Sequence, residues 1–351
     1  MNEPCYACHE TQGEDSMTFI RAIGRPLAVA GLALALPAAA QAEVYKGETA
    51  GVGDPVHTMF VAFANQAAKA GIEIQVNAGQ TLTKSMLKGA RGEIDFFSAV
   101  PSLVNLMAGR KAMYRNIEDA PELAKNLRAI LGFKAGAYHP VTLAGSGIER
   151  WEDIKGKTVF TGPPAGSASA TSEALIRIIT GYEPGRDYTA VRLSWGEGYA
   201  ALADGKIDMM VRPAEIGSAN IQQFGLSGAF RILSIPEEAV SSEAIQALFG
   251  QPGRGMVQFD GSIYKGQLTK GPITALGFFQ FIGVSASVPD DVVYAATKAF
   301  WENLDEVHAS AFFLRDVTPQ TAFTAINVPL HPGALRYYEE AGFDIPHALR
   351  P

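Results

Sequence analysis

Along the chain the spacing of hydrophobic residues alternates between patterns typical of strands and patterns typical of helices. Residues 157–181 show this most clearly. Residues 157–160 form a short apolar run that is typical of a buried strand. A turn rich in glycine, proline and serine follows, and apolar residues then recur at helical spacing as far as Ile179, with Gly181 as the expected cap. This layout directs backbone N–H groups and small hydroxyls towards an anion, although a plain strand–turn–helix unit with a Ser or Thr cap has the same pattern.

The same periods predict the other elements. We expect strands at 44–53, 72–76, 93–98, 129–133, 140–144, 189–194, 204–210 and 273–286. We expect helices at 57–69, 82–89, 101–128 with a break at Pro121, 166–181, 197–203, 289–306 and 333–340. Residues 231–275 are irregular and rich in glycine and proline.

The second half of the chain repeats the order of the first. Four pairs of identical residues share one spacing of 113 positions: Gly53 and Gly166, Gly92 and Gly205, Ile94 and Ile207, and Asp95 and Asp208. Alternating strands and helices favour α/β lobes with mostly parallel sheets. We therefore predict two similar α/β lobes, with a ligand cleft between them at the carboxyl ends of strands.

Composition and charge narrow the possible partners. The 351 residues are 47% hydrophobic and 19% charged, which suits one large or two medium domains. The net charge is −7 and there is no basic run, so the sequence argues against nucleic acid as a partner.

Residues 17–42 have the pattern of a signal peptide. Arg21 and Arg25 precede an apolar stretch at 27–36, and Ala40-Gln41-Ala42 is a typical cleavage site. We expect cleavage after Ala42, a periplasmic mature protein, and an upstream extension at residues 1–16.

The upstream extension contains Cys5 and Cys8 in a Cys-x-x-Cys-His pattern, which is typical of covalent haem attachment. Cleavage would remove this pattern, so we expect no cofactor in the mature protein. A haem-carrying electron-transfer protein remains an alternative that absorbance would test.

Several stretches in order resemble one family. They are Gly162-Pro163-Pro164 with the following Gly/Ser turn, residues 205–208 (Gly-Lys-Ile-Asp), 264–267 (Tyr-Lys-Gly-Gln), 288–294 (Val-Pro-Asp-Asp-Val-Val-Tyr) and 330–334 (Leu-His-Pro-Gly-Ala) with Tyr337-Tyr338. From about Val44 to the C-terminus the chain resembles the TAXI-type solute receptors, the periplasmic substrate-binding proteins of one class of TRAP transporter.

The resemblance implies a type II periplasmic-binding-protein-like fold, with a hinge and a ligand cleft between two α/β lobes. We place lobe 1 at 43–140 plus 276–351 and lobe 2 at 141–275. The implied function is capture of a small organic anion, a carboxylate or a glutamate-like amino acid, and its delivery to TRAP membrane subunits by a monomer.

The chain departs from the family pattern in three loops. Residues 51–54 read Gly-Val-Gly-Asp where the family has Gly-Thr-Gly-Gly, the turn after Pro164 carries an inserted Ala165, and Arg212-Pro213-Ala214-Glu215 replaces an apolar loop.

Candidate ligand-binding residues are glycines and polar or aromatic side chains near predicted strand ends. They are Gly53, Asp54, His57, Asn77, Gln80, Thr81, Ser98, Gly166, Ser167, Ser169, Trp195, Arg212 and Glu215. Arg212 suits a bidentate grip on a carboxylate, while Asp54 and Glu215 suit either a ligand ammonium or a pairing with Arg212. Each residue also has a structural alternative as a solvated edge, a cap or a packing residue.

The signs of an enzyme are weak. Gly156-Lys157-Thr158 resembles the end of a P-loop, but Trp151 stands where its first glycine is needed. The sequence has no G-x-S-x-G or H-E-x-x-H motif and no metal-ligand spacing. An exported two-lobed enzyme acting on a small carboxylate is nevertheless kept as the alternative, because fold alone does not exclude catalysis.

Overall fold

The computed structural model describes residues 43–164 and 168–351. Its strands form one hydrogen-bonded sheet in the order β2-β1-β3-β10-β4-β7-β5-β6, with β8 paired to β4 and β9 paired to β10. The strands are β1 (Val44–Glu48), β2 (Glu73–Asn77), β3 (Phe96–Ala99), β4 (Leu127–Leu143), β5 (Thr158–Phe160), β6 (Thr189–Val191), β7 (Met209–Ala214), β8 (Phe230–Ile232), β9 (Arg254–Asp260) and β10 (Pro272–Ser285).

Helices surround this sheet. They are α1 (Pro55–Lys69), α2 (Leu82–Arg91), α3 (Pro101–Ala108), α4 (Ala120–Ala124), α5 (Ala168–Thr180), α6 (Trp195–Ala203), α7 (Ala219–Gln222), α8 (Phe224–Ser227), α9 (Glu237–Val240), α10 (Glu243–Phe249), α11 (Asp290–Glu302), α12 (Leu304–Ser310) and α13 (Pro332–Glu340). A short 3₁₀ helix, η1 (Ala112–Tyr114), follows α3.

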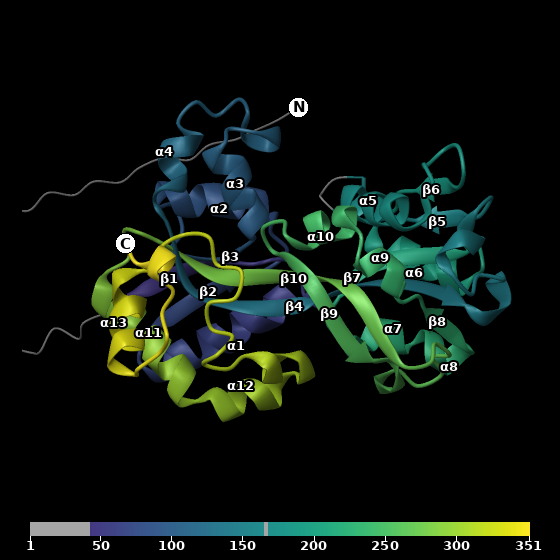
Figure 1. The fold of residues 1–351 in the computed structure, drawn as a ribbon. Helices are drawn as coiled ribbons and strands as arrows, with labels where there is room; N and C mark the ends of the chain where they lie inside the picture. Colours follow the sequence, from purple (N-terminus) through teal and green to yellow (C-terminus); the bar gives the residue numbers. More distant parts are fainter. Residues whose placement is uncertain (1–42, 165–167) are drawn as a thin grey trace, which may run out of the picture. The chain divides into compact units, whose positions relative to one another are not determined.

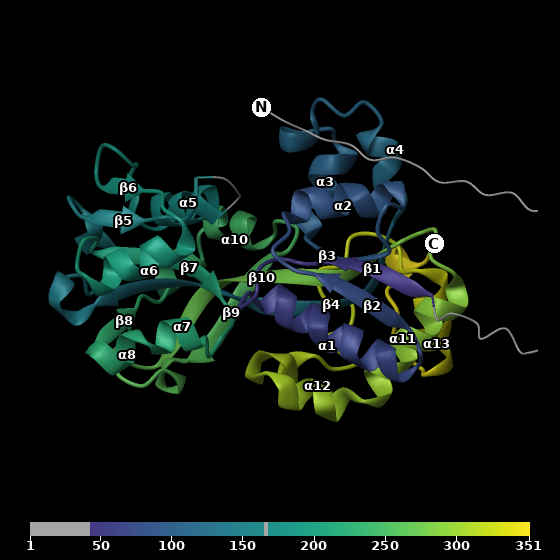
Figure 2. The same ribbon diagram turned by 180° about the vertical axis from the view of Figure 1, so that it is seen from behind.

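Two long strands, β4 and β10, run side by side from one group of elements to the other (Figures 1 and 2). The first lobe contains β1–β3 with α1–α4 and α11–α13, and the second contains β5–β9 with α5–α10 (Figure 1). The two-lobed α/β, type II periplasmic-binding-protein-like architecture is thereby confirmed. One buried hydrophobic cluster contains residues of both lobes and the shared strands, and a second contains residues of the second lobe and the shared strands.

The sheet is mixed, which corrects the expectation of mostly parallel lobes. β1 pairs in parallel with β2 and β3, and β5 pairs in parallel with β6 and β7. β10 is antiparallel to β3, β4 and β9, and β4 is antiparallel to β7 and β8. The expected parallel pairing therefore holds among β1, β2 and β3 and among β5, β6 and β7. The two strands that cross between the lobes, β4 and β10, are antiparallel to their neighbours.

The internal repeat predicted from sequence is visible in the backbone. Gly92 and Gly205, which follow α2 and α6, have φ angles of +72° and +68°. Glycine adopts a positive φ after a helix without the steric penalty that other residues have there. In the next strands, Phe96 pairs with Gly47 of β1 and Met209 pairs with Val159 of β5.

In the first lobe the sheet is covered on both faces. Successive side chains of a strand point to opposite faces, and the ring of Phe96 lies 6.0 Å from that of Phe63 on α1. Its neighbour Phe97 packs on the other face against α2, where Gly89 leaves room for the ring. The two phenylalanines thus fix α1 and α2 on opposite sides of β3.

In the second lobe the same alternation separates two cores. Val159 and Met209 pack with Leu175 and Ile176 of α5. Phe160 packs instead against α6, where Gly198 lies beneath its ring and Trp195 meets it edge-on at 5.5 Å. The second face of this lobe therefore positions the first residue of α6.

The strands expected at 129–133 and 140–144 are one continuous strand, β4. Pro140 was expected to start a new strand, but it lies inside β4 opposite Val211. Gly136 has a φ of +156°, and a Cβ there would lie 2.0 Å from the carbonyl oxygen of Ala214. Glycine at this position therefore lets β4 and β7 approach closely.

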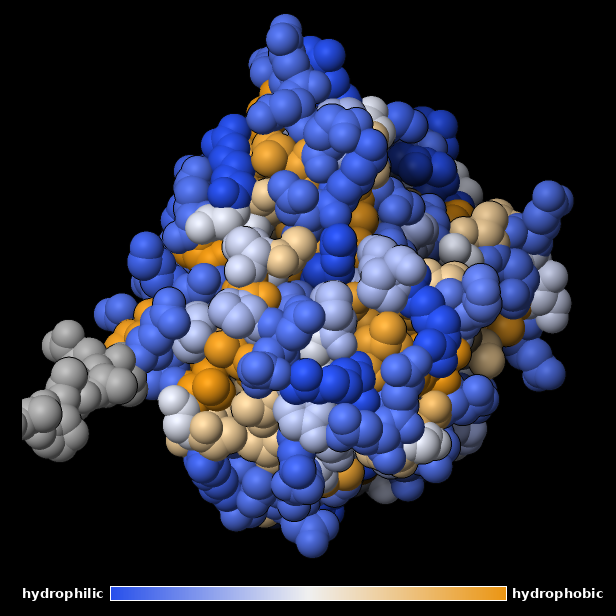
Figure 3. Space-filling model, turned by 90° about the vertical axis from the view of Figure 1, so that its left-hand side faces the viewer, coloured by the Kyte–Doolittle hydropathy of each residue, from blue (hydrophilic) through white to orange (hydrophobic). Residues whose placement is uncertain are grey.

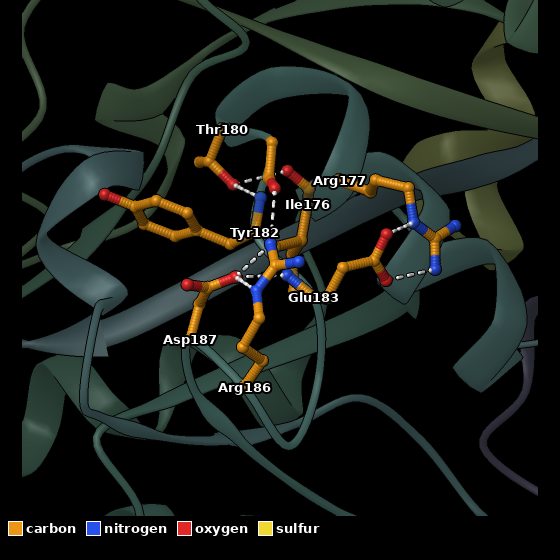
Figure 4. A network of polar contacts seen from close by, with 8 residues as sticks. Ile176, Arg177, Thr180, Tyr182, Glu183, Arg186 and Asp187 are labelled. Carbon is orange, nitrogen blue, oxygen red and sulfur yellow. Dashed lines mark hydrogen bonds and ion pairs between the residues drawn. The ribbon is translucent and has the colours of Figure 1, made fainter.

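Polar contacts fix the loop between α5 and β6 (Figure 4). Arg177 Nε and Nη2 donate to the two carboxylate oxygens of Glu183 at 2.6 and 2.8 Å. Arg186 donates to Asp187 Oδ2, which also accepts from the backbone N–H of Glu183. These contacts hold the C-terminal end of α5.

The face on the side of α11 and α13 is covered mainly by hydrophilic side chains, with hydrophobic ones in small separate groups (Figure 3). Among the described residues, no helix is both long and apolar enough to cross a membrane. The predicted signal peptide lies outside the described residues.

Candidate functional site

A cavity of about 550 Å³ lies where both lobes and the shared strands meet. It is lined by residues from the first turns of α1, α2, α3, α5 and α6, together with residues of η1, β4, β7, β9 and β10. Helix N-termini carry partial positive charge and free N–H groups, and so favour anions.

Most of the lining is aliphatic or aromatic. Its charged and polar side chains are Asp54, Thr81, Thr83, Ser102, Tyr138, Arg212, Arg254 and Gln280. These include two arginines and one carboxylate, so the charged side chains of the lining have a net positive charge. An apolar wall with a few polar groups is the usual composition of a small-molecule site.

Arg212 of β7 is almost completely buried, at 6% exposure. Its guanidinium stacks 4.0 Å from the ring of Trp195 and lies 5.8 Å from the ring of Tyr199. Its Nε is buried without a hydrogen-bond partner among the described residues. Ring stacking therefore holds the guanidinium, and a donor that costs free energy while unpaired remains available to a ligand.

Asp54, the N-cap of α1, is the carboxylate nearest to that guanidinium. Its Oδ1 lies 3.6 Å from Arg212 Nη2, which is an ion-pair distance but longer than a good hydrogen bond. Burial raises the pKa of Asp54 above its usual value, and the opposing influence of Arg212 is the smaller one. Asp54 is thus an incomplete counter-ion for Arg212.

Arg254, at the start of β9, brings a second cation to the cavity. Its Nη2 donates to Thr171 Oγ1 at 2.9 Å, and its guanidinium lies 5.2 Å from the ring of Tyr138. Among the described residues it forms no ion pair with a carboxylate. The positive charge of Arg254 is therefore not neutralised within the site.

A buried pair behind Arg212 fixes the loop that follows β7. His139 lies opposite Arg212 in the β4–β7 register. Its Nδ1 lies 2.9 Å from the carbonyl oxygen of Ala137, so Nδ1 carries the proton and Nε2 accepts from the hydroxyl of Tyr264, also at 2.9 Å.

Tyr264 then connects the pair to the loop. Its oxygen accepts from the backbone N–H groups of Gly217 and Ser218. Burial lowers the pKa of His139 to about 4, so the ring is neutral at pH 7. The network thus positions the end of β7 without adding charge behind Arg212.

Four of the residues predicted from the sequence line the cavity together. Asp54, Thr81, Trp195 and Arg212 come from the starts of α1, α2 and α6 and from β7. Asp54, Thr81 and Trp195 stand at the beginnings of helices, where ligands of α/β folds are expected. Arg212 was expected just past a strand end but lies inside β7, because the strand continues to Ala214.

Three predicted residues instead make internal hydrogen bonds away from the cavity lining. Ser98 is buried and donates to Thr49 Oγ1 at 2.8 Å. Ser169 donates to the carbonyl of Pro163 at 2.8 Å, and Gln80 Nε2 donates to that of Ala78 at 3.1 Å. Their hydroxyl or amide groups stabilise the loops that surround the cavity.

The other predicted residues also lie off the lining. Gly53 and Asn77 are exposed, His57 is half-buried on α1, and Glu215 is half-buried after β7. Gly166 and Ser167 lie outside the described residues, so the predicted anion site in that turn stays a prediction. Ala168, the first residue of α5, does line the cavity.

The sequence reasoning missed Arg254, Tyr138 and the lining residues of β10. Residues 231–275 look irregular because they contain many glycines and prolines. The alternation of buried Val257 and Phe259 with exposed neighbours in β9 was the available signal for a strand there. Its first residue, Arg254, would then have been a candidate at a strand end.

Solved structures with similar folds include three periplasmic proteins. The chain is 14% identical to the aliphatic sulphonate binding protein SsuA from Escherichia coli, with a TM-score of 0.46 over 85% of this chain and 83% of that one. It is 15% identical to the ectoine-binding protein of the TeaABC TRAP transporter from Halomonas elongata, with a TM-score of 0.40 over 85% and 90%. A TRAP solute binding protein from Sulfitobacter with bound β-D-galacturonate is 14% identical, with a TM-score of 0.42 over 84% and 94%.

A family model gives a match along most of the sequence. The model described as the NMT1-like family matches residues 51–342, a range that includes the shared strands, every charged residue of the cavity and all of both lobes except β1 and the C-terminal residues. The chain belongs to the NMT1-like family.

Proposed function

We propose that this protein is an exported solute-binding protein that captures a small organic anion in the cavity and delivers it to the membrane subunits of a transporter. The observation that carries the proposal is Arg212. A buried guanidinium held by an aromatic ring, with a donor unpaired among the described residues, suits a carboxylate or a related acid group.

The two-lobed arrangement supports a hinge mechanism. Asp54 and Thr81 belong to the first lobe, whereas Trp195 and Arg212 belong to the second, and all four line one cavity. A ligand that contacts both lobes stabilises their closed arrangement. We place the hinge where β4 and β10 cross, with lobe 1 at 43–140 plus 276–351 and lobe 2 at 141–275.

The finer assignment follows the sequence resemblance. We propose a TAXI-type receptor of a TRAP transporter that acts as a monomer in the periplasm after cleavage behind Ala42. N-terminal sequencing of periplasmic protein tests the cleavage site, and Glu43 is the expected first residue. Reconstituted uptake with the TRAP membrane subunits tests the partner.

Calorimetry with Arg212 variants tests the function. The purified mature protein is first screened with carboxylates and amino acids by thermal shift, and any co-purifying ligand is identified by mass spectrometry. Arg212→Ala should then weaken binding of the best acid by about 30-fold or more, because truncating one partner of a buried charge pair costs about 2–5 kcal/mol. Arg212→Lys should recover only part of the loss, since lysine lacks the planar fork.

Arg336→Ala is the matched control. Arg336 also stacks on a tyrosine, with 4.0 Å to the ring of Tyr294, but lies on α13 outside the cavity lining. Its removal should leave binding unchanged. If Arg212→Ala binds the best acid within about threefold of wild type, the difference is below ~1 kcal/mol. Arg212 would then not be the group that binds the anion.

A further inference from the structure

Arg254 reaches the cavity from a different strand than Arg212. Between β9 and β7 lie β10 and β4, so the two arginines are three strand spacings apart across the sheet, about 14 Å in the hydrogen-bonding direction. Both side chains nevertheless line the same cavity. The cavity therefore has two cationic groups that approach it from separate parts of the fold.

The position of Arg254 is fixed by its own contacts. Its guanidinium lies near the ring of Tyr138 and donates one hydrogen bond to Thr171, a residue in the first half of α5. Tyr138 in turn meets Phe278 edge-on, with 6.1 Å between ring centroids. An aromatic wall thus supports Arg254, much as Trp195 supports Arg212.

The cavity that both arginines line is otherwise mostly apolar. Phe278 and Phe279 of β10, with Leu103 and Leu106 of α3, are among the lining residues. Of the described residues that line the cavity, Asp54 is the only carboxylate, and it already lies beside Arg212. A ligand ammonium would therefore meet two cations and one shared carboxylate.

We infer that Arg254 is a second anion anchor, and that the ligand carries two acidic groups on an apolar body and no ammonium group. This inference rests on the proposed function, and it names the ligand class of the same cavity. One acidic group binds Arg212 and the other binds Arg254, while the aromatic side chains of β10 contact the body. Neutral polar side chains such as Gln280 complete the site.

Matched acids test the inference by calorimetry. The probes are three sets: the diacids glutarate, adipate, pimelate and terephthalate; the monoacids pentanoate, hexanoate, heptanoate and benzoate; and the amino diacids glutamate and 2-aminoadipate. We expect wild type to bind at least one diacid about fivefold or more tightly than its monoacid, because Arg254 is half-buried and a partly exposed ion pair contributes less than a buried one. The amino diacids should bind more weakly than glutarate and adipate.

Arg254→Gln should abolish the preference for the diacid and change binding of the monoacid by less than about threefold. Arg336→Gln, the control on α13, should leave both unchanged. Equal binding of monoacids and diacids by wild type, or equal weakening of both by Arg254→Gln, would overturn the second anchor and leave the proposed function standing. If wild type binds none of these acids, the inference and the proposed function both fail.

Discussion

Asp95 and Asp208 make the same hydrogen bond in the two lobes. Oδ2 of Asp95 accepts from the backbone N–H of Lys46 in β1 at 2.7 Å, and Oδ2 of Asp208 accepts from that of Thr158 in β5 at 2.8 Å. Each aspartate also returns a backbone bond to the carbonyl of the same residue. The Gly-x-Ile-Asp repeat therefore marks one structural device, which ties the turn before a strand to its parallel neighbour.

We predict that Asp95→Ala and Asp208→Ala lower the free energy of unfolding by similar amounts. Each removes one hydrogen bond to a half-buried carboxylate, and the expected loss is about 1 kcal/mol per variant. Asp208 also lies 3.9 Å from Lys157 Nζ, but so long an ion pair between partly exposed groups contributes little. Urea unfolding of the two variants measures it.

Asp344→Ala, in an exposed loop, is the control and should change stability little. Asp95→Asn and Asp208→Asn keep an acceptor oxygen and should lose less than the alanine variants. A large loss in one lobe with none in the other would show that the two turns are not equivalent.

His139 should make stability depend on pH. Its pKa is about 4 in the folded protein, because burial disfavours the charged ring, and near 6.5 in the unfolded chain. Below pH 6.5 the unfolded chain binds a proton that the folded protein does not, so this stabilising contribution is present above pH 6.5 and is lost as the pH falls towards 4. The charged group that faces His139 is Arg212, and the other titratable neighbour is Tyr264.

Unfolding free energies between pH 7 and pH 4 check this expectation. His139→Gln cannot titrate, so wild type should lose stability over this range by an amount of the order of 3 kcal/mol more than the variant does. Comparison with the variant removes the contribution of every other group, including His331, whose pKa burial also lowers. Parallel pH profiles would mean that His139 accepts a proton in the folded protein.

The sequence predicts the local units of this fold better than their connection. The sequence places α1, α2, α6 and β10 to within a few residues, because the helices have apolar residues at helical spacing and β10 is a long, mostly buried apolar run. The sequence predicts two strands where the structure has the single strand β4, because Pro140 is typical of a strand start. The pairing of β4 with β7 overrides this local preference. The antiparallel pairing of β4 and β10 across both lobes depends on contacts between residues far apart in the chain, which no local period encodes.

For the site, too, local sequence predicts some residues and long-range packing determines the others. Asp54, Thr81 and Trp195 were predictable because each lies where a helix begins, whereas Arg212 lies inside β7. Ser98 lies near the end of β3, yet its hydroxyl donates a hydrogen bond to Thr49, directly after the neighbouring strand β1. Arg254 depends on β9, which has weak sequence signals of its own. Position along a strand therefore predicts which residues are near a cleft, but packing decides which side chains face it.

Asp54 should compete with the ligand for Arg212. Its carboxylate lies 3.6 Å from the guanidinium, and burial already raises its pKa, so the site tolerates its charge poorly. Asp54→Asn removes the charge and keeps a side chain that is equally suited to the N-cap of α1. We predict that this variant binds an organic acid about fivefold more tightly than wild type, which corresponds to a partly exposed charge interaction of about 1 kcal/mol.

The direction of the change separates the two roles that the sequence left open for Asp54. A carboxylate that receives a ligand ammonium would make Asp54→Asn bind more weakly, whereas a competing counter-ion makes it bind more tightly. The pH dependence gives a second measure. In wild type, affinity for the acid should fall as the pH rises through the raised pKa of Asp54, because the ionised carboxylate then competes for Arg212. In Asp54→Asn this fall should disappear, and calorimetry of both proteins over a pH series that starts below the usual pKa of an aspartate would show it. Weaker binding by the variant at every pH would assign Asp54 to an ammonium instead.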